Sequence, residues 1–337
     1  MTQSDPAVHR RTVLGTVGAG TALAVAGCLG DEETLRMMTA TEGTTAYAAN
    51  EGLAAVVNDH SDEVFAEAQP SAGTEENIGA LADEDTEMAY IQNWTIREII
   101  EEEAPYDDLG FEPTQVFHFY QLPWFFVTNH DDIEGLTDVE GMQINPTPEG
   151  SGTAPALEQA LDYAVDDYDR VSYDYGEQGS AMEEGRLDVA VGTYMNFSID
   201  PGWQQEMMGT VDTYVVPIEE DVLAEWEDDE GIQVDSFPGE ELENAADAPE
   251  ETWTPVFEYN FLAREELDYD LVYSFLEALH ENREELEDYH ELLGAMADEE
   301  FFVELLYDDI PLHAAAYDYW EEQGLLEDHD YESADEP

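Results

Sequence analysis

The 337-residue sequence contains no lysine and has only 8 arginines, against 84 aspartates and glutamates. The net charge of −76 argues against nucleic acid or an anionic lipid surface as a partner, because such surfaces would be repelled. The acidic residues are spread through every segment, which is typical of adaptation to concentrated salt. At about molar salt the Debye length is about 3 Å, so most of the repulsion is screened. We therefore expect the fold to be lost on dialysis to low salt.

The sequence has a single cysteine, Cys28, so no disulfide can form within the chain. The preceding residues, Val25-Ala26-Gly27, resemble a lipobox, in which cleavage leaves the cysteine as a lipidated N-terminus. We expect residues 1–27 to be a signal peptide and residues 28–34 a tether. The protein would then be extracytoplasmic and lipid-anchored through Cys28 to the outer face of the cell membrane.

The leader also indicates an export route. Arg10 and Arg11 precede a weakly apolar run from Val13 to Gly27, as in a twin-arginine (Tat) signal. The run is rich in alanine and glycine and is too short to span a bilayer comfortably.

Signals for catalysis or metal binding are also lacking. The histidines are scattered, and none belongs to an HExxH or a close His/Cys pattern. Ser151 lies in Gly-Ser-Gly rather than in a Gly-x-Ser-x-Gly elbow, and Asp166–Asp169 lacks the glycine and glutamate of a calcium loop. Acidic pairs are so frequent that they carry no catalytic signal. We therefore expect no catalytic residue, no metal site and no cofactor.

The first part of the chain repeats the order strand, loop, helix three times, which predicts a parallel sheet with crossover helices. We expect strands over 35–38, 64–68 and 88–91. Helices are expected over 48–59 and 75–82, and a third helix follows the last of these strands and ends at residue 100. In such sheets, ligands bind beyond the carboxyl ends of the strands. The loops at these ends supply the candidate ligand-binding residues Gly43, Thr44, Thr45, Tyr47, Ser71, Thr74, Gln92 and Asn93.

The stretch Asn145–Ala164 combines an irregular segment with a helix. Prolines and glycines keep 146–152 out of regular structure, and a helical pattern of Ala and Leu follows from Thr153. The unpaired N–H groups and the dipole of this helix start suit an anion. The alternative is an ordinary Ser/Thr N-cap. The candidate ligand-binding residues here are Gly150, Ser151, Gly152 and Thr153.

The rest of the chain predicts a second lobe and a return to the first. A long aromatic strand over 116–127 crosses into it, and a strand over 256–263 crosses back. Between them we expect a short helix and strand over 136–144, strands over 168–175, 189–192 and 211–217, a helix over 179–185 and a surface loop over 228–251. Tyr194, at the end of one of these strands, is a further ligand-binding candidate. Helices are expected over 270–289, 298–306 and 313–323, and disorder over 327–337.

These expectations define an α/β protein of two lobes. Lobe 1 comprises 35–122 plus 257–326, and lobe 2 comprises 123–256. Each lobe would be a mainly parallel sheet flanked by helices, and two crossing strands would join them. Such proteins close on a ligand by hinge motion.

Six short motifs occur in order along the chain: Thr39–Tyr47 with Gly52-Leu53-Ala54, Ser71–Asn77, Ala89–Asn93, Tyr120 with Pro123, Gly150–Thr153, and Pro311-Leu312-His313. Together they resemble the TAXI solute-binding receptors of TRAP transporters. The resemblance implies the type II periplasmic binding-protein fold. It also implies a receptor that captures a small carboxylate or an amino acid such as glutamate and delivers it to TRAP membrane subunits.

Two residues depart from the family pattern. Glu42 stands where a small or hydroxyl residue is usual, and Thr44 replaces a glycine. A carboxylate at position 42 would repel an anionic ligand or bind an amine, so Glu42 would favour an amino acid over a dicarboxylate. Arg97 is a further candidate contact. His313 lies in a family motif, but we expect it to cap or pack at a helix start.

Three alternatives remain open. A receptor of similar fold could serve an ATP-driven importer, which the absence of an adjacent TRAP membrane-subunit gene would indicate. An enzyme on this fold, similar to a pyrimidine-synthesis protein, would need a reactive His or Cys in the cleft, whereas Cys28 lies in the leader. A purely structural surface lipoprotein would show no ligand-dependent thermal shift.

Overall fold

The computed structural model describes residues 32–101, 104–107, 109–149, 151–327 and 329–334. The expected signal peptide, Cys28 and Gly150 lie outside the described residues. None of the helices in the described part of the chain has both the length and the apolar character needed to span a bilayer.

The first lobe begins with the expected threefold repeat. The elements are β1 (Glu33–Met38), α1 (Thr45–His60), β2 (Val64–Gln69), α2 (Thr74–Ala82), β3 (Met88–Gln92) and α3 (Asn93–Ile100). Strand β1 lies parallel to both β2 and β3, which confirms the expected parallel sheet. Helix α1 buries Leu53, Val56 and Val57. Because β1, β2 and β3 are parallel, the loops that follow them lie at one edge of the sheet.

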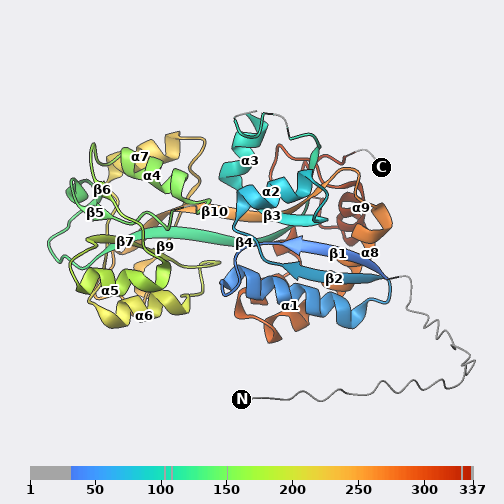
Figure 1. Cartoon of the computed structure of the whole chain (residues 1–337), viewed down its shortest axis with the longest axis horizontal. Helices are drawn as coiled ribbons and strands as arrows, with labels where there is room; N and C mark the ends of the chain where they lie inside the picture. Colours follow the sequence, from blue (N-terminus) through green and yellow to red (C-terminus); the bar gives the residue numbers. More distant parts are fainter. Residues whose placement is uncertain (1–31, 102–103, 108, 150, 328, 335–337) are drawn as a thin grey trace, which may run out of the picture. The chain divides into compact units, whose positions relative to one another are not determined.

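Two long strands connect this sheet to a second one. Strand β4 (Pro113–Thr128) lies antiparallel to β10 (Glu251–Arg264), as can be followed in green and orange in Figure 1. One end of β10 pairs with β3, and one end of β4 pairs with β7 (Val189–Thr193). Nearly every residue of both strands is buried, as expected for continuous apolar runs covered on both faces.

The second sheet lies around the far end of β4. Its other strands are β5 (Gln143–Ile144), β6 (Asp169–Arg170), β8 (Tyr214–Val215) and β9 (Val234–Pro238). Strand β5 pairs in parallel with β6 and β7, β8 lies antiparallel to β4, and β9 lies antiparallel to β10. The helical elements are η1 (Leu136–Val139), α4 (Ala154–Asp162), η2 (Tyr175–Glu177), α5 (Gln178–Glu183), α6 (Gly202–Thr210), α7 (Glu220–Asp228) and η3 (Gly239–Glu241).

Several expectations for the second lobe are wrong. The strands expected over 168–175 and 211–217 shrink to β6 and β8, two residues each. Helices α6 and α7 were not expected, because their apolar residues are few and acidic residues interrupt them. The surface loop expected over 228–251 contains β9, which is held by its pairing with β10. A strand of this kind depends on a distant partner rather than on its own pattern.

The C-terminal part returns to the first lobe through α8 (Tyr269–Glu281), η4 (Arg283–Asp288), η5 (Glu291–Ala297), η6 (Glu300–Phe302) and α9 (Ala314–Gln323). The helix expected over 298–306 is reduced to η6. His313 has the expected capping role, because its ring accepts a hydrogen bond from Ala315 N at 3.3 Å. Burial lowers its pKa, and its other ring nitrogen lies 3.0 Å from Leu267 O.

The disorder expected for the acidic tail does not extend to residues 329–334. Ser333 forms a parallel bridge with Leu312, and Leu312 N donates to Glu332 O at 2.8 Å. The Tyr331 hydroxyl donates to Val303 O at 3.0 Å. One aromatic residue and two backbone hydrogen bonds therefore hold this acidic segment in place.

Candidate functional site

The first loop forms the start of α1. Thr44 is its N-cap, and the Thr44 hydroxyl accepts from Tyr47 N at 3.2 Å and donates to Thr41 O at 2.9 Å. Gly43 is exposed and has φ +88°, while Thr45 and Tyr47 are partly buried. Glu42 is exposed. Thr44 therefore acts as a helix cap, and ligand binding by this loop stays a prediction.

The second loop is tied to the end of β1. The Ser71 hydroxyl donates to Thr39 O at 2.6 Å, and Asn77 Nδ2 donates to Thr39 O at 2.9 Å and to Tyr90 O at 3.0 Å. The hydroxyl of Ser71 is thus used within the loop. Thr74 is the first residue of α2, whose N-cap, Gly73, gives no side-chain cap.

Gln92 joins the two lobes. Its Oε1 accepts from Thr95 N at 2.6 Å and so caps α3, while its Nε2 donates to Gly152 O at 2.8 Å. A Cβ atom at Gly152 would lie 3.2 Å from the Thr74 hydroxyl oxygen. The structure therefore brings together three sequence-predicted residues, Thr74, Gln92 and Gly152, from both lobes.

The start of α4 lies next to this contact. The N-cap is Thr153, and no side chain caps the helix. The hydroxyls of Ser151 and Thr153 lie 2.9 Å apart. Ser151 also lies close enough to Tyr175 to offset part of the rise that burial causes in the pKa of Tyr175. The alternative of an ordinary Ser/Thr cap is thus not what α4 shows. Thr153 N–H and Ala154 N–H bond with Ser151, and Pro155 has no N–H. Ala156 N–H and the positive end of the helix dipole remain to attract an anion.

The start of α2 differs from that of α4 in charge. The first turn of α2 carries Glu75 and Glu76, whereas the first turn of α4 has no acidic residue. Glu76 reaches back to accept from Ala72 N at 2.6 Å. A negative group is therefore favoured at α4 rather than at α2.

Asn93 and Arg97 belong to a second contact between the lobes. Asn93 Nδ2 donates to Gln233 Oε1 at 3.1 Å and to Val256 O at 3.2 Å. The Arg97 guanidinium lies 4.3 Å from the Trp94 ring centroid and packs against Gly231. Both side chains are thus engaged in protein contacts, and a ligand role for either stays a prediction.

Tyr194 lies apart from these residues. Its ring centroid is 5.0 Å from that of Phe237, and burial together with Glu241 and Asp200 raises the pKa of its hydroxyl. It lines a pocket of about 630 Å³ bordered by acidic side chains. Among the described residues no hydrogen bond joins Tyr194 to 151–153, so its ligand role also stays a prediction.

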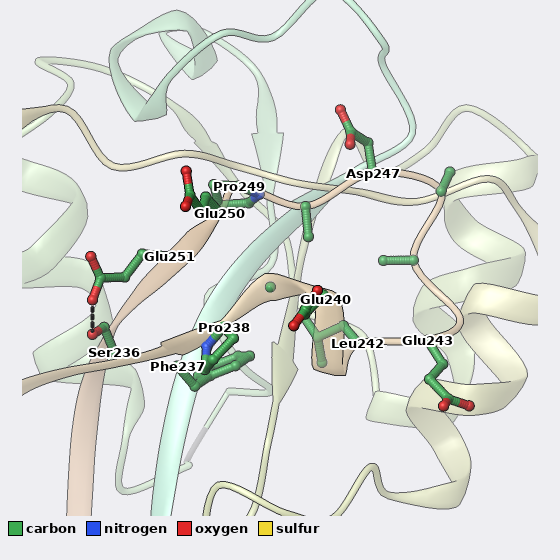
Figure 2. A pocket seen from close by; sticks show the side chains of 14 residues that line it. Ser236, Phe237, Pro238, Glu240, Leu242, Glu243, Asp247, Pro249, Glu250 and Glu251 are labelled. Carbon is green, nitrogen blue, oxygen red and sulfur yellow. Dashed lines mark hydrogen bonds between the residues drawn. The ribbon is translucent and has the colours of Figure 1, made fainter.

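A larger pocket of about 980 Å³ is lined by the single segment Ser236–Glu251 (Figure 2). The Ser236 hydroxyl donates to Glu251 at 2.9 Å across one side of it. Several of its labelled residues are carboxylates, and none of the sequence-predicted site residues lines it.

Sequence reasoning missed the aromatic residues around the Gln92–Gly152 contact. Tyr259 is directly opposite Gln92 on β3 and directly opposite Tyr120 on β4. Tyr90 precedes Gln92 by two residues, so both side chains lie on the same face of β3. This two-residue spacing was the available signal, but it could not reveal which strands are neighbours.

In the described part of the chain, no group of three or more His, Cys, Asp or Glu side chains is placed to hold a metal ion. Arg264 and Arg186 make contacts within the protein. Arg264 donates to Leu81 O at 2.8 Å and to Thr86 O at 3.1 Å, and Arg186 pairs with Glu184.

Two sheets joined by two crossing strands, with helix starts facing each other where they meet, define a two-lobed α/β protein of the type II periplasmic binding-protein fold. The chain belongs to the NMT1-like family, whose profile matches residues 37–324. A comparison with curated proteins found no match.

A comparison with solved structures finds similar chains at low sequence identity. A TRAP periplasmic solute binding protein from Ochrobactrum anthropi is 13% identical, with 80% of each chain covered and a TM-score of 0.42. The aliphatic sulphonate binding protein SsuA from Escherichia coli is 13% identical, with 86% of this chain and 78% of that chain covered and a TM-score of 0.45. The probable amino-acid ABC transporter extracellular-binding protein ytmK from Bacillus subtilis is 14% identical, with 78% and 98% covered and a TM-score of 0.46. Each of these three is described as a binding protein.

Proposed function

We propose that this protein is an extracytoplasmic solute receptor of the TAXI type. It is tethered to the membrane by lipid on Cys28, captures a small carboxylate or an amino acid such as glutamate, and delivers it to TRAP membrane subunits. It performs no chemistry, and its mechanism is binding coupled to closure of the two lobes.

The observation that carries this proposal is the uncapped start of α4 beside Gly152, in contact with Gln92 and Thr74 of the other lobe. The Ala156 N–H and the positive end of the helix dipole would attract a carboxylate without an arginine. The absence of a Cβ at Gly152 lets a ligand approach this backbone closely.

Hydrogen bonds between the lobes would stabilise the closed state. Gln92 reaches Gly152, and Asn93 reaches Gln233, so two hydrogen bonds from successive residues of lobe 1 end on lobe 2. A solute at the start of α4 would be enclosed as these contacts form. Strands β4 and β10 connect the lobes and would carry the hinge motion.

The test is a thermal-shift screen of carboxylates and amino acids in molar KCl, followed by calorimetric affinities for the solute that binds. Gly152→Ala is expected to weaken binding at least fivefold, because the added methyl group narrows the gap to Thr74. Gly209→Ala is the matched control, since a Cβ there meets nothing within 4 Å.

Two results would contradict the proposal: no compound raises the melting temperature, or the two alanine variants bind the solute equally. The gene context separates the transporter types, because a TRAP receptor should be encoded beside TRAP membrane subunits and an importer receptor beside an ATPase.

A further inference from the structure

A row of side chains crosses the first sheet at the point where it meets lobe 2. Gln92, Tyr259 and Tyr120 lie directly opposite one another on β3, β10 and β4, so their side chains share one face. The rings of Tyr120 and Tyr259 are stacked at 4.7 Å, and Tyr90 lies 4.6 Å from Tyr259. Because Gln92 contacts Gly152 O, this face is the one directed at the start of α4.

Lobe 2 contributes a second set of rings. Tyr175 is stacked between Trp124 and Trp203, with centroid distances of 5.5 Å and 5.0 Å. The Ser151 side chain partly offsets the rise that burial causes in the pKa of Tyr175, so this stack lies beside the start of α4. The indole nitrogen of Trp124 is buried and has no hydrogen-bond partner, so one donor beside the site is unused.

These six rings form what we call the aromatic cluster: Tyr90, Tyr120, Trp124, Tyr175, Trp203 and Tyr259. Burial raises the pKa of Tyr175 to about 12, and burial with the neighbouring Tyr175 hydroxyl also raises the pKa of Tyr90, Tyr120 and Tyr259. All four phenols are therefore neutral at physiological pH. They offer hydroxyl groups and electron-rich ring faces, but no charge.

No arginine of the described residues contacts this cluster. The described arginines instead contact Glu87 (Arg36), Trp94 (Arg97), Glu158 (Arg170), Glu184 (Arg186), the carbonyls of Leu81 and Thr86 (Arg264), and Glu299 (Arg283). The chain has no lysine. A solute with two carboxylates would find the positive end of the α4 dipole for one of them and no cation for the other.

The aromatic cluster would stabilise a positively charged group of the solute but not a second carboxylate. The faces of Tyr and Trp rings attract cations, including alkylated ammonium groups that have no N–H to donate. The start of α2, which meets Gly152 through Thr74, adds the negative charges of Glu75 and Glu76. The net charge of −76 also favours a solute that is not anionic.

Building on the function proposed above, we propose that the solute is a zwitterion, with its carboxylate at the start of α4 and its ammonium group against the aromatic cluster. Separation of the lobes exposes the rings of each side, and the ammonium group takes the place of contacts between them. The aromatic faces then select for the positive group, while α4 selects for the carboxylate.

The test compares three probes by calorimetry on the full chain in molar KCl: alanine, trimethylglycine and succinate. At least one of the two zwitterions is expected to bind, with succinate at least tenfold weaker. Tyr175→Phe keeps the ring and is expected to retain affinity within threefold, whereas Tyr175→Leu is expected to lose at least tenfold. Phe275→Leu, which removes a fully buried ring of α8 outside the cluster, is the control for general destabilisation.

Two outcomes overturn the inference and leave the proposed function standing. Succinate could bind as tightly as the zwitterions and lose affinity in Gly152→Ala, or Tyr175→Leu could bind the zwitterion as well as Tyr175→Phe does. Absence of binding by all three probes, and by the wider screen of carboxylates and amino acids, overturns both.

Discussion

Glu258 is a buried carboxyl group on the crossing strand β10, directly opposite Gln121 of β4. It is 6% exposed, its Oε1 accepts from Gln233 Nε2 at 2.7 Å, and no cation pairs with it among the described residues. Burial raises its pKa from 4.5 to about 7, with a further contribution from the charges of Asp235 and Glu304, while the amides of Gln233 and Gln121 oppose this. Tyr307, which faces it from another element, donates to its backbone carbonyl.

The sign of the pH effect follows from the raised pKa. The folded state binds this proton more tightly than the unfolded state does. The contribution of protonated Glu258 to the free energy of unfolding is therefore fully present below pH 4.5 and is lost as the pH rises through about 7. Glu258→Gln removes the titration. We expect it to raise the free energy of unfolding by about 1–3 kcal/mol at pH 8 and to change it little at pH 5. Urea titrations in molar KCl at both pH values measure this, with exposed Glu227→Gln as control. An equal effect of Glu258→Gln at both pH values would refute the assignment.

Asn77, near the start of α2, belongs to one of the motifs that carry the family resemblance, but no role for it followed from the sequence. Its side chain donates to Thr39 O and Tyr90 O and thereby joins the ends of two strands to α2. Asn77→Leu leaves both carbonyls without this donor, and we expect a loss of about 2–4 kcal/mol in the free energy of unfolding. The exposed Asn244→Leu should change it by less than about 0.5 kcal/mol. Equal effects on the midpoint of urea unfolding would show that the Asn77 bonds contribute nothing.

At the level of single residues, the sequence indicated which loops are candidates for ligand binding. It did not indicate whether each side chain binds a ligand or bonds to the backbone. Thr44, Ser71 and the Gln92 oxygen could equally have faced a ligand or the backbone. The structure shows each of them bonded to nearby backbone groups. Small hydroxyl and amide side chains at helix starts satisfy either partner, so spacing alone cannot separate the two roles.

At the level of elements, α7 shows how the second lobe is held together. Trp226 is fully buried, and its indole N–H donates to Ala160 O of α4 at 2.9 Å. The helix that presents Gly152 and Thr153 to the site is therefore supported from behind by an element that the sequence pattern did not predict.

Trp226→Ala should remove this support. We expect a loss of about 3–5 kcal/mol in the free energy of unfolding from the cavity alone, and about 1–2 kcal/mol for Trp226→Phe, which loses mainly the hydrogen bond. Urea unfolding followed by circular dichroism measures both. If the two variants were equally stable, packing of the indole would not be what fixes α7.

The elements that sequence reasoning found are those whose pattern is local. The first three strands and helices have clear periodicity and short loops, and they appear close to the expected bounds. Strands β6 and β8 have only two residues each, and β9 depends on β10. Helix α6 lacks a continuous apolar stripe. Short pairings of this kind are stabilised by contacts distant in sequence, which no local pattern records.

For the whole molecule, the distribution of charge is the dominant constraint. The net charge is −76, and the arginines in the described part of the chain contact carboxylates or backbone carbonyls. Most carboxylates therefore face solvent and one another. Folding brings these charges closer together, so repulsion opposes the compact state unless salt screens it.

We expect the melting temperature to fall steadily as KCl is lowered from molar concentration, with loss of helical circular dichroism after dialysis to about 10 mM salt, where the Debye length is about 30 Å. Restoring the salt should restore the spectrum if unfolding is reversible. A far-UV spectrum that does not change on dialysis would contradict salt dependence of the fold.

The sequence by itself determined the α/β class, the parallel order of the first sheet, the crossing strands and the acidic character, because these depend on composition and local periodicity. Only the tertiary structure decided which loops meet. Gln92 contacts Gly152 from 60 residues away, and Tyr120 and Tyr259 stack although 139 positions separate them. Such proximity arises from pairing of distant strands and packing of two lobes, and a one-dimensional pattern does not contain it.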